Sequence, residues 1–526
     1  MTLRPLPDSP NLEQLKKQAK SLLRDAHAGD GDALARFSAL PAFQSSRQPL
    51  DGAALALHDA QSVLAREHGF VSWNALREEV EARTLSFSDA VDAFVRAASD
   101  GEPDRAKRLL GLYPSIANAT LQAELLLGDA VAVAKRLAAD PHLATTPGGP
   151  QQWDPLLYVC HTCLHREHPQ RMDALLVIAR QLLSLGANPN AEYTWNWHPE
   201  LPRTALWAAL ITLGHIPLAT ALLEAGATPT DGVTPQIAAG SGNLEALELL
   251  HKYGLNPNGV PGGVPPLAYL MTWSEDPRGP RWLLEHGADP NLPWGPDGEG
   301  PLHTAARRWD LAMVQLLITH GADPSQRRAD GYTAHTLAEL HGNHAIAEFL
   351  LANGATNELA PLEQFIAAAA RGDRPAADAI LATYPDVATQ LTPKHHLMLQ
   401  PHAEHGHAAV LEVMLERGFD SNVPDHDGVT ALHRAAMGGH PAAAATLVRF
   451  GARLDTLDGM FSATPLVWAV EGRSSNRHPG SDHVGVARVL IDAGSPLDWV
   501  PPPAAPGPER TLDALRQIRA DAVAGR

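Results

Sequence analysis

Two clusters of residues in this 526-residue sequence have the composition of a metal site. In the first cluster, two cysteines stand three residues apart and two histidines follow them closely. Thiolates and neutral imidazoles are the ligands that zinc prefers, and four of them at short spacing could complete a tetrahedral site. The residues are Cys160, Cys163, His165 and His168.

The second cluster is a run of histidines between positions 395 and 407. Neutral imidazole is the commonest metal ligand in proteins. The two clusters together support one hypothesis, a metal-dependent enzyme or a metal sensor. The members of the second cluster are His395, His396, His402, His405 and His407.

Other catalytic patterns do not appear along the chain. It contains no nucleophile elbow, no phosphate-binding loop and no HExxH sequence. Paired carboxylates such as Glu78 and Glu79 fall on helix faces that we expect to be solvated. We therefore expect a protein that is not an enzyme and uses no cofactor, and both clusters must be weighed against a purely structural explanation.

An internal repeat defines the elements that position these residues. Each unit begins with a turn and a short helix, as in DGVTALHRAAMGGH (427–440), and ends with a second helix and a glycine turn. Such ends recur in LLEAGATPT (222–230), LLEHGADPN (283–291) and LLITHGADPS (316–325). The turn glycines Gly254, Gly287, Gly321 and Gly354 follow one another at steps of 33, 34 and 33 residues. A period of this length predicts a solenoid of stacked helix pairs.

The turn, the Thr-capped first helix, the paired alanines and the Leu-Leu of the second helix make the chain similar to bacterial ankyrin-repeat proteins. The resemblance implies an all-α ankyrin solenoid of about a dozen repeats with helical caps at both ends. It also places Cys160 at a small alanine position that faces the adjacent unit, and His407 in the turn between two helices. In this family such histidines hydrogen-bond the turns, so we favour a structural role for both clusters.

A longer periodicity divides the array into two blocks. The segment FVRAASDGEPDRAKRLLGLYPSIANA (94–119) matches FIAAAARGDRPAADAILATYPDVATQ (365–390), and both contain Tyr-Pro where other units have Gly-Ala. We therefore expect four regions. They are a helical N-terminal capping segment (1–86), ankyrin block one (87–358), ankyrin block two (361–499), and a Pro-rich linker with a C-terminal helix (500–526).

Tryptophan is unusually frequent, with 11 residues in the chain. Several aromatic residues fall in the fingers, which are the loops between repeats. Others fall in the turn between the two helices of a pair. In the ankyrin-repeat proteins that the chain resembles, fingers and first helices line the concave face of the stack. Exposed Trp and Tyr side chains there anchor partners. The predicted function is a non-catalytic scaffold that binds one or more proteins there, with a single obligate partner as a narrower version. The candidate partner-binding residues are Tyr193, Trp195, Trp197, Trp294 and Trp309.

The charge balance narrows the class of partner. The chain has 41 Lys and Arg against 59 Asp and Glu, a formal net charge of −18. This sign of charge repels nucleic acid and anionic lipid and favours a basic protein partner. Two cysteines cannot form a disulfide framework, and neither a leader peptide nor a membrane span is recognisable, so we expect a cytoplasmic protein.

Overall fold

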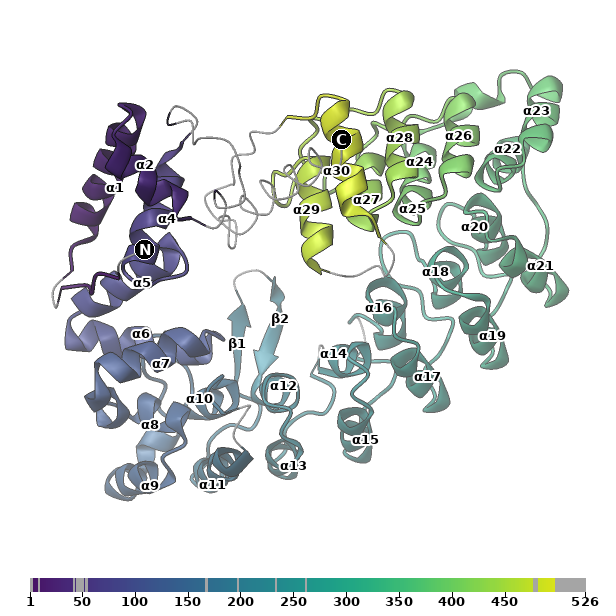
Figure 1. Ribbon diagram of the computed structural model, residues 1–526. Coiled ribbons are helices and arrows are strands. Elements are labelled where there is room, and N and C mark those ends of the chain that lie inside the picture. Colours follow the sequence, from purple (N-terminus) through teal and green to yellow (C-terminus); the bar gives the residue numbers. More distant parts are fainter. Residues whose placement is uncertain are drawn as a thin grey trace. The chain divides into compact units, whose positions relative to one another are not determined.

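The computed structural model describes residues 3–7, 10–40, 43, 52, 55–165, 169–195, 198–231, 234–260, 263–475 and 481–496. These residues form two compact units, Met1–Pro266 and Leu267–Arg526. Each unit is a series of helix pairs in which the first helices pack side by side in one layer and the second helices in another (Figure 1). The predicted all-α repeat architecture is confirmed.

The N-terminal unit begins with four helices around their own hydrophobic core, which includes Leu22, Phe37 and Leu76. These helices are α1 (Leu12–His27), α2 (Gly31–Ser38), α4 (Leu57–Glu67) and α5 (Trp73–Thr84). Five pairs follow. They are α6/α7 (Phe87–Ser99, Pro103–Leu112), α8/α9 (Leu121–Leu127, Ala130–Ala139), α10/α11 (Pro155–His161, Pro169–Ser184), α12 with η4/α13 (Ala205–Trp207, Ala208–Thr212, Ile216–Glu224) and α14/α15 (Thr234–Gly240, Leu244–Lys252).

The C-terminal unit continues the same pattern. Its pairs are α16/α17 (Pro266–Trp273, Arg278–Glu285), α18/α19 (Pro301–Arg308, Leu311–Thr319), α20/α21 (Ala334–Leu340, His344–Ala352), α22/α23 (Pro361–Ala370, Arg374–Thr383), α25/α26 (Leu399–Glu404, Ala408–Glu416), α27/α28 (Ala431–Gly438, Pro441–Arg449) and α29/α30 (Pro465–Ser475, His483–Asp492). Short helices lie in the connections of both units. They are η2 (Pro114–Asn118) and η3 (Pro141–Ala144) in the N-terminal unit, and η5 (Val387–Gln390) and α24 (Pro393–His396) in the C-terminal unit. The predicted region boundaries stay predictions.

Local sequence explains where the helices begin and end. Thr333 caps α20, since its hydroxyl oxygen accepts the backbone N–H of Thr336 at 3.2 Å. A glycine after most second helices closes the helix in the left-handed conformation, as Gly321 does with φ at +90°, while α7, α9 and α23 end without one. Alanine pairs such as Ala305 and Ala306 are fully buried and let neighbouring first helices approach closely.

One finger, which carries Tyr193 and Trp195, contains strands. It forms an antiparallel hairpin of β1 (Glu192–Trp195) and β2 (His198–Thr204). Glu192 pairs with Thr204 and Tyr193 with Arg203, and the register shifts before Trp195. Among the described residues, no helix is both long and apolar enough to cross a bilayer.

Candidate functional site

The base of the β1/β2 hairpin is held by a column of aromatic rings. Tyr193 stacks on Trp153 with 4.2 Å between ring centroids, and the edge of its ring meets His161 at 5.0 Å. Burial raises the pKa of the Tyr193 hydroxyl. The contacts with Trp153 and His161 anchor the hairpin through one part of the Tyr193 ring. The side chain as a whole is half-buried. Trp195 lies in β1, but its side chain and all of Trp197 fall outside the described residues.

The same column continues toward the first helix of the next pair. His161 stacks on Trp207 at 5.9 Å, and the guanidinium carbon of Arg203 lies 3.8 Å from the Trp207 ring centroid. Burial, with the nearby positive charge of Arg203, lowers the pKa of His161 to about 3. The imidazole is therefore neutral at physiological pH and acts here as a packing group rather than an acid or a base.

Two further predicted residues lie in the C-terminal unit, and both are half-buried. Trp294 and Glu299 exchange backbone hydrogen bonds of 3.0 and 3.1 Å across a finger. The indole N–H of Trp309 donates to the carbonyl of Met271 at 2.8 Å, which ties the end of α18 to the last turn of α16. Each residue thus has a structural contact and an accessible part.

Sequence reasoning missed the most exposed tryptophan in this region. Trp273, the last residue of α16, is 66% exposed. It lies two residues after Met271, next to the Trp309 contact, and Arg308 ends the neighbouring helix α18. Aligning PPLAYLMTW with the start of α18 places Trp273 at the Arg308 position, the end of a first helix. This alignment with α18 could have identified Trp273 from the sequence as a residue at the end of a first helix.

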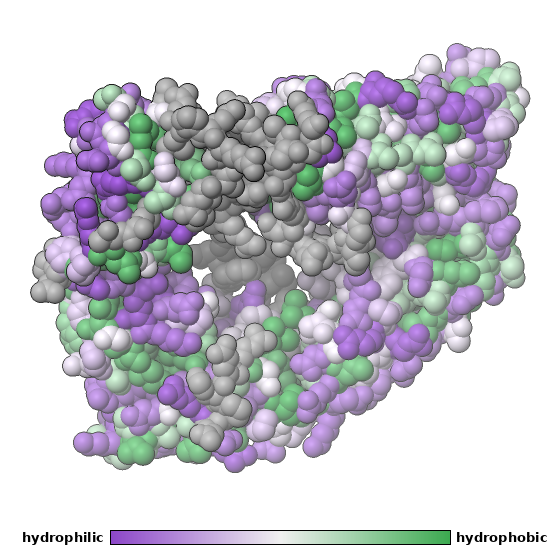
Figure 2. Space-filling model, in the orientation of Figure 1, coloured by the Kyte–Doolittle hydropathy of each residue, from purple (hydrophilic) through white to green (hydrophobic). Residues whose placement is uncertain are grey.

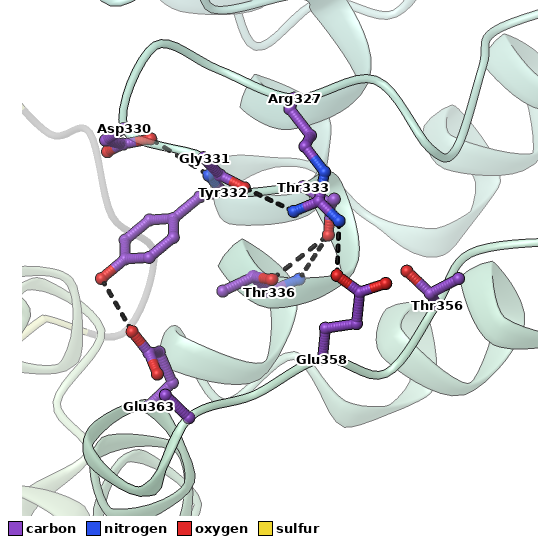
Figure 3. A pocket seen from close by; sticks show the side chains of 10 residues that line it. Arg327, Asp330, Gly331, Tyr332, Thr333, Thr336, Thr356, Glu358 and Glu363 are labelled. Carbon is purple, nitrogen blue, oxygen red and sulfur yellow. Dashed lines mark hydrogen bonds and ion pairs between the residues drawn. The ribbon is translucent and has the colours of Figure 1, made fainter.

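A polar cavity of about 170 Å³ opens between the finger before α20 and the segment that leads into α22 (Figure 3). Arg327 closes one side, where its guanidinium donates to the Gly331 carbonyl at 2.9 Å and pairs with Glu358. On the other side, the Tyr332 hydroxyl donates to Glu363 at 3.4 Å. Burial and the charges of Glu363 and Asp330 raise the pKa of Tyr332 to about 12.

This cavity holds no catalytic arrangement in the described residues. Its charged groups are largely paired with each other, and Asp330 also pairs with Lys394. Its hydroxyl groups belong to Tyr332, which donates to Glu363, and to threonines, of which Thr333 already bonds Thr336 at 3.2 Å. A nucleophile needs a base within hydrogen-bond reach, and no histidine lines the cavity. The geometry suits polar recognition of a surface group.

The histidines of the 395–407 cluster serve as structural connectors. His395 accepts the backbone N–H of Thr392 on Nδ1 at 3.1 Å, as His433 does from Thr430 at 3.2 Å. His396 accepts the N–H of Asp420 at 3.2 Å. An imidazole that accepts on Nδ1 carries its proton on Nε2, and burial lowers the pKa of His395 and His396.

His402 makes a different contact in the same region. Its Nδ1 lies 3.3 Å from Nδ1 of His407, so one ring donates to the other. Burial, with neighbouring His407 and His405, lowers the pKa of His402 to about 4. His402 lies in α25 and His407 is the N-cap residue of α26, so their contact links the two helices of one pair.

A glycine makes room for the next histidine along the stack, and this can be tested. A Cβ atom on Gly406 would lie 2.7 Å from His440, and Gly406 also has φ at +74°. We expect Gly406→Ala to lower the free energy of unfolding by about 2–3 kcal/mol through clash and backbone strain. Gly451→Ala is the matched control, because Gly451 has φ at +86° with nothing within 4 Å of the added atom.

Adding His440→Ala to Gly406→Ala should restore the part of the loss that comes from the clash. The coupling between the two changes, measured by urea unfolding, should exceed about 0.5 kcal/mol. Strictly additive losses would contradict the packing role assigned to this imidazole.

One cysteine is buried and the other is half-buried. Cys160 is completely buried, and burial raises the pKa of its thiol. The Cys163 thiol donates to the carbonyl of Ala97 at 3.7 Å, and its pKa is also raised by burial. His165 hydrogen-bonds the carbonyl of Leu126 at 2.8 Å, while His168 lies outside the described residues. Burial therefore keeps both thiols protonated, whereas zinc binds thiolates.

Neither predicted metal cluster is assembled in the part of the chain that the structure describes. The group of three potential ligands found there consists of Asp425, His426 and Asp427, none of which was predicted. The carboxylate of Asp425 already accepts the N–H groups of Asp427 and Val429 at 3.0 Å each and pairs with Arg434. The hydrogen bonds that form this turn therefore explain why the three side chains lie close together.

Comparison with known proteins supports the repeat assignment. The family model of ankyrin repeats matches three stretches of the C-terminal half, residues 269–360, 365–458 and 397–497. Ankyrin repeats are a general protein–protein interaction module, and the fold of this chain is an ankyrin solenoid.

The curated relatives share this module over short stretches. The human espin-like protein is 47% identical over 53 residues, which are 10% of this chain and 5% of that protein. The human ankyrin repeat and SOCS box protein 16 is 27% identical over 226 residues, 41% of this chain and 49% of that protein. The mouse 2-5A-dependent ribonuclease is 41% identical over 58 residues, 11% of this chain and 8% of that protein.

The chain thus spans half or less of the length of each of these relatives. The shared part is the repeat module, so no activity follows from the names of whole proteins. The predicted kinship with bacterial proteins stays a prediction, because these relatives come from human and mouse.

Proposed function

We propose that the chain is a non-catalytic scaffold that binds a partner protein through the fingers and the ends of the first helices of its ankyrin solenoid. Ankyrin repeats are a general protein–protein interaction module, and a binding role needs no catalytic group. The metal-dependent hypothesis is not proposed, because Cys160 is buried with a raised pKa and His395 and His396 accept backbone N–H groups.

The observation that carries this proposal is the exposure of Trp273. Most of the described surface visible in Figure 2 is hydrophilic, and its hydrophobic residues occur in small separate patches. A tryptophan that is 66% exposed leaves a large apolar area in water. Together with Trp309 and Arg308 it supplies the residue types that dominate binding energy in interfaces.

The aromatic residues predicted from the sequence belong to the same proposal. Tyr193, Trp195 and Trp197 would act from the hairpin, and Trp294 from its finger. The net charge of −18 favours a partner with a basic surface. We place this binding in the cytoplasm, which is consistent with two free cysteines.

The direct test is loss of partner capture by Trp273→Ser. Full-length protein would be immobilised, exposed to lysate of the source cell, and the retained proteins quantified by mass spectrometry. We expect at least a tenfold reduction for the specific partner, because truncating a central tryptophan anchor weakens binding by about 2 kcal/mol or more.

Val131→Ser is the matched control, since Val131 is an exposed apolar residue on α9 in the other unit. It should leave capture unchanged. A specific partner retained equally by wild type and Trp273→Ser would remove the surface at the end of α16 from the proposal.

A further inference from the structure

The finger between α28 and α29 holds three large apolar side chains in solvent. Leu457, Met460 and Phe461 are 54%, 52% and 48% exposed. We call these three residues the apolar tip. Burial of such side chains stabilises a fold, so their joint exposure needs a cause outside the packing of this unit.

A buried carboxylate builds the turn that presents the apolar tip. Asp458 is only 2% exposed, and one of its oxygens accepts the N–H groups of Met460 and Phe461 at 2.8 and 2.6 Å. The other oxygen accepts the N–H of Ala463 at 3.0 Å and the indole N–H of Trp468 at 2.9 Å. Four donors on one carboxylate fix the backbone of this finger before any partner arrives.

The same loop in neighbouring units shows what is special here. The finger before α27 closes around Asp425 with Gly428 at φ +76°, and the finger before α20 has Gly331 at φ +85°. At the corresponding place the tip finger has Ser462 at φ +49°, a conformation that residues other than glycine rarely adopt. This finger is also one residue longer, from Asp458 to Thr464 against Asp425 to Thr430. The changed turn holds the apolar tip outward despite local strain.

Packing against the preceding finger makes the turn rigid. The N–H of Gly459 donates to the carbonyl of Asp427 at 2.6 Å. A Cβ atom on Gly428 would lie 2.9 Å from the nitrogen of Gly459, so the two backbones are in close contact. Rigid presentation reduces the entropy lost when a partner binds.

The charges around the apolar tip indicate the chemistry of its partner. The tip finger and the finger before it carry five aspartates. Asp458 is buried and Asp425 pairs with Arg434, whereas Asp420 and Asp455 are exposed. Asp455 pairs with Arg453 at 3.5 Å, and the formal charge of the two fingers stays negative. The aspartates are Asp420, Asp425, Asp427, Asp455 and Asp458. A stable dimer buries roughly 800 Å² on each partner, far more than three half-exposed side chains offer. A short segment therefore fits better than a second copy of the chain.

We propose that the apolar tip is a preformed docking site for a partner segment with large apolar side chains flanked by lysine or arginine. This rests on the proposed function of the chain as a binding scaffold. It adds a second contact surface, separate in sequence from Trp273, and states the chemistry of the segment that the surface takes.

The test uses a phage-displayed library of random 12-residue peptides, selected against the full chain at low salt. Selected peptides would be synthesised and their Kd values measured by fluorescence anisotropy. We expect an apolar core with cationic flanks, and at least about a tenfold loss of affinity for Leu457→Ser/Met460→Ser/Phe461→Ser. Val131→Ser should bind within about twofold of wild type, and higher salt should weaken binding.

Asp458→Asn is the second variant, because it leaves the apolar side chains in place and removes the charge that orders their turn. Asp458→Asn should raise the Kd of the selected peptides. The triple variant should keep the wild-type Tm, since the three replaced side chains are solvent-exposed. A Tm drop in Asp458→Asn leaves the triple variant as the deciding measurement.

Five results would overturn the proposal. Peptides could bind the triple variant as tightly as wild type, or selection could favour acidic flanks. Truncation after residue 496 could raise peptide affinity, which would show that the chain covers its own tip. Wild type could sediment as a dimer that the triple variant abolishes. Peptides lost only in Trp273→Ser would support the scaffold function while overturning the tip, so the two failures are distinguishable.

Discussion

Acidification from pH 6.5 toward pH 4 is expected to destabilise the N-terminal unit, and His161 should account for a separable part of the loss. Burial and the charge of Arg203 lower the folded-state pKa of His161 to about 3, against an ordinary value of 6.5. Between these values the unfolded chain binds a proton that the folded chain does not. Stability is therefore fully present above pH 6.5 and is lost as the pH falls, by up to about 1.4 kcal/mol per pH unit.

The variant that isolates this contribution is His161→Phe, which keeps a ring between Tyr193 and Trp207 but cannot titrate. Hydrogen-exchange protection of α10 would be followed at pH 7, 6 and 5, after correction for the intrinsic exchange rate. We expect the pH slope to be smaller in His161→Phe than in wild type. The exposed His142 supplies the control, because His142→Phe should keep the wild-type slope. Equal slopes in all three proteins would contradict the neutral buried imidazole.

The repeat architecture could be predicted because its signals are local and recur. A left-handed glycine after most second helices, as at Gly287, and a capping threonine before a first helix, as at Thr430, are set by backbone geometry within a few residues. Repetition then shows that each helix pair packs on the next. The described residues form twelve pairs, from α6/α7 to α29/α30, which match the expected number of about a dozen.

The elements that were missed depend on contacts that the period does not encode. The β1/β2 hairpin is held by Tyr193 on Trp153, residues 40 positions apart in the sequence. The expected N-terminal cap contains a helix pair built like a repeat, because LAREHG (64–69) at the end of α4 resembles LAELHG (337–342) at the end of α20. Gly69 and Gly342 both have positive φ, at +85° and +74°. That similarity was readable from the sequence.

The candidate surfaces were harder to predict than the fold. Composition drew attention to the histidines, but whether a histidine is a ligand or a turn connector depends on which backbone groups face it, as Thr392 faces His395. Trp273 escaped notice because an exposed position and a buried one differ by a small rotation about the helix axis. The apolar tip depends on Asp458 gathering four donors, which requires the folded turn.

Phe365→Ala should produce the largest loss of stability in the C-terminal unit. Phe365 is fully buried in the core of this unit and stacks on Phe419 with 6.4 Å between centroids. Removing a buried phenylalanine ring costs about 3–5 kcal/mol, since the surroundings refill the cavity only in part. Phe94 occupies the matching position in the earlier block and is equally buried, so Phe94→Ala should cause a similar loss in the N-terminal unit.

Because each repeat contacts only its neighbours, the two losses should be local. In Phe365→Ala, hydrogen exchange should accelerate in α22 and its neighbour α26, while α6 keeps its protection. The reverse should hold for Phe94→Ala. Tyr384→Ala controls for loss of an aromatic ring at an exposed position and should cost less than about 0.5 kcal/mol. Equal acceleration along the whole chain would mean that the two blocks unfold as one cooperative unit, and the division inferred from the matching Phe94 and Phe365 segments would have no energetic counterpart.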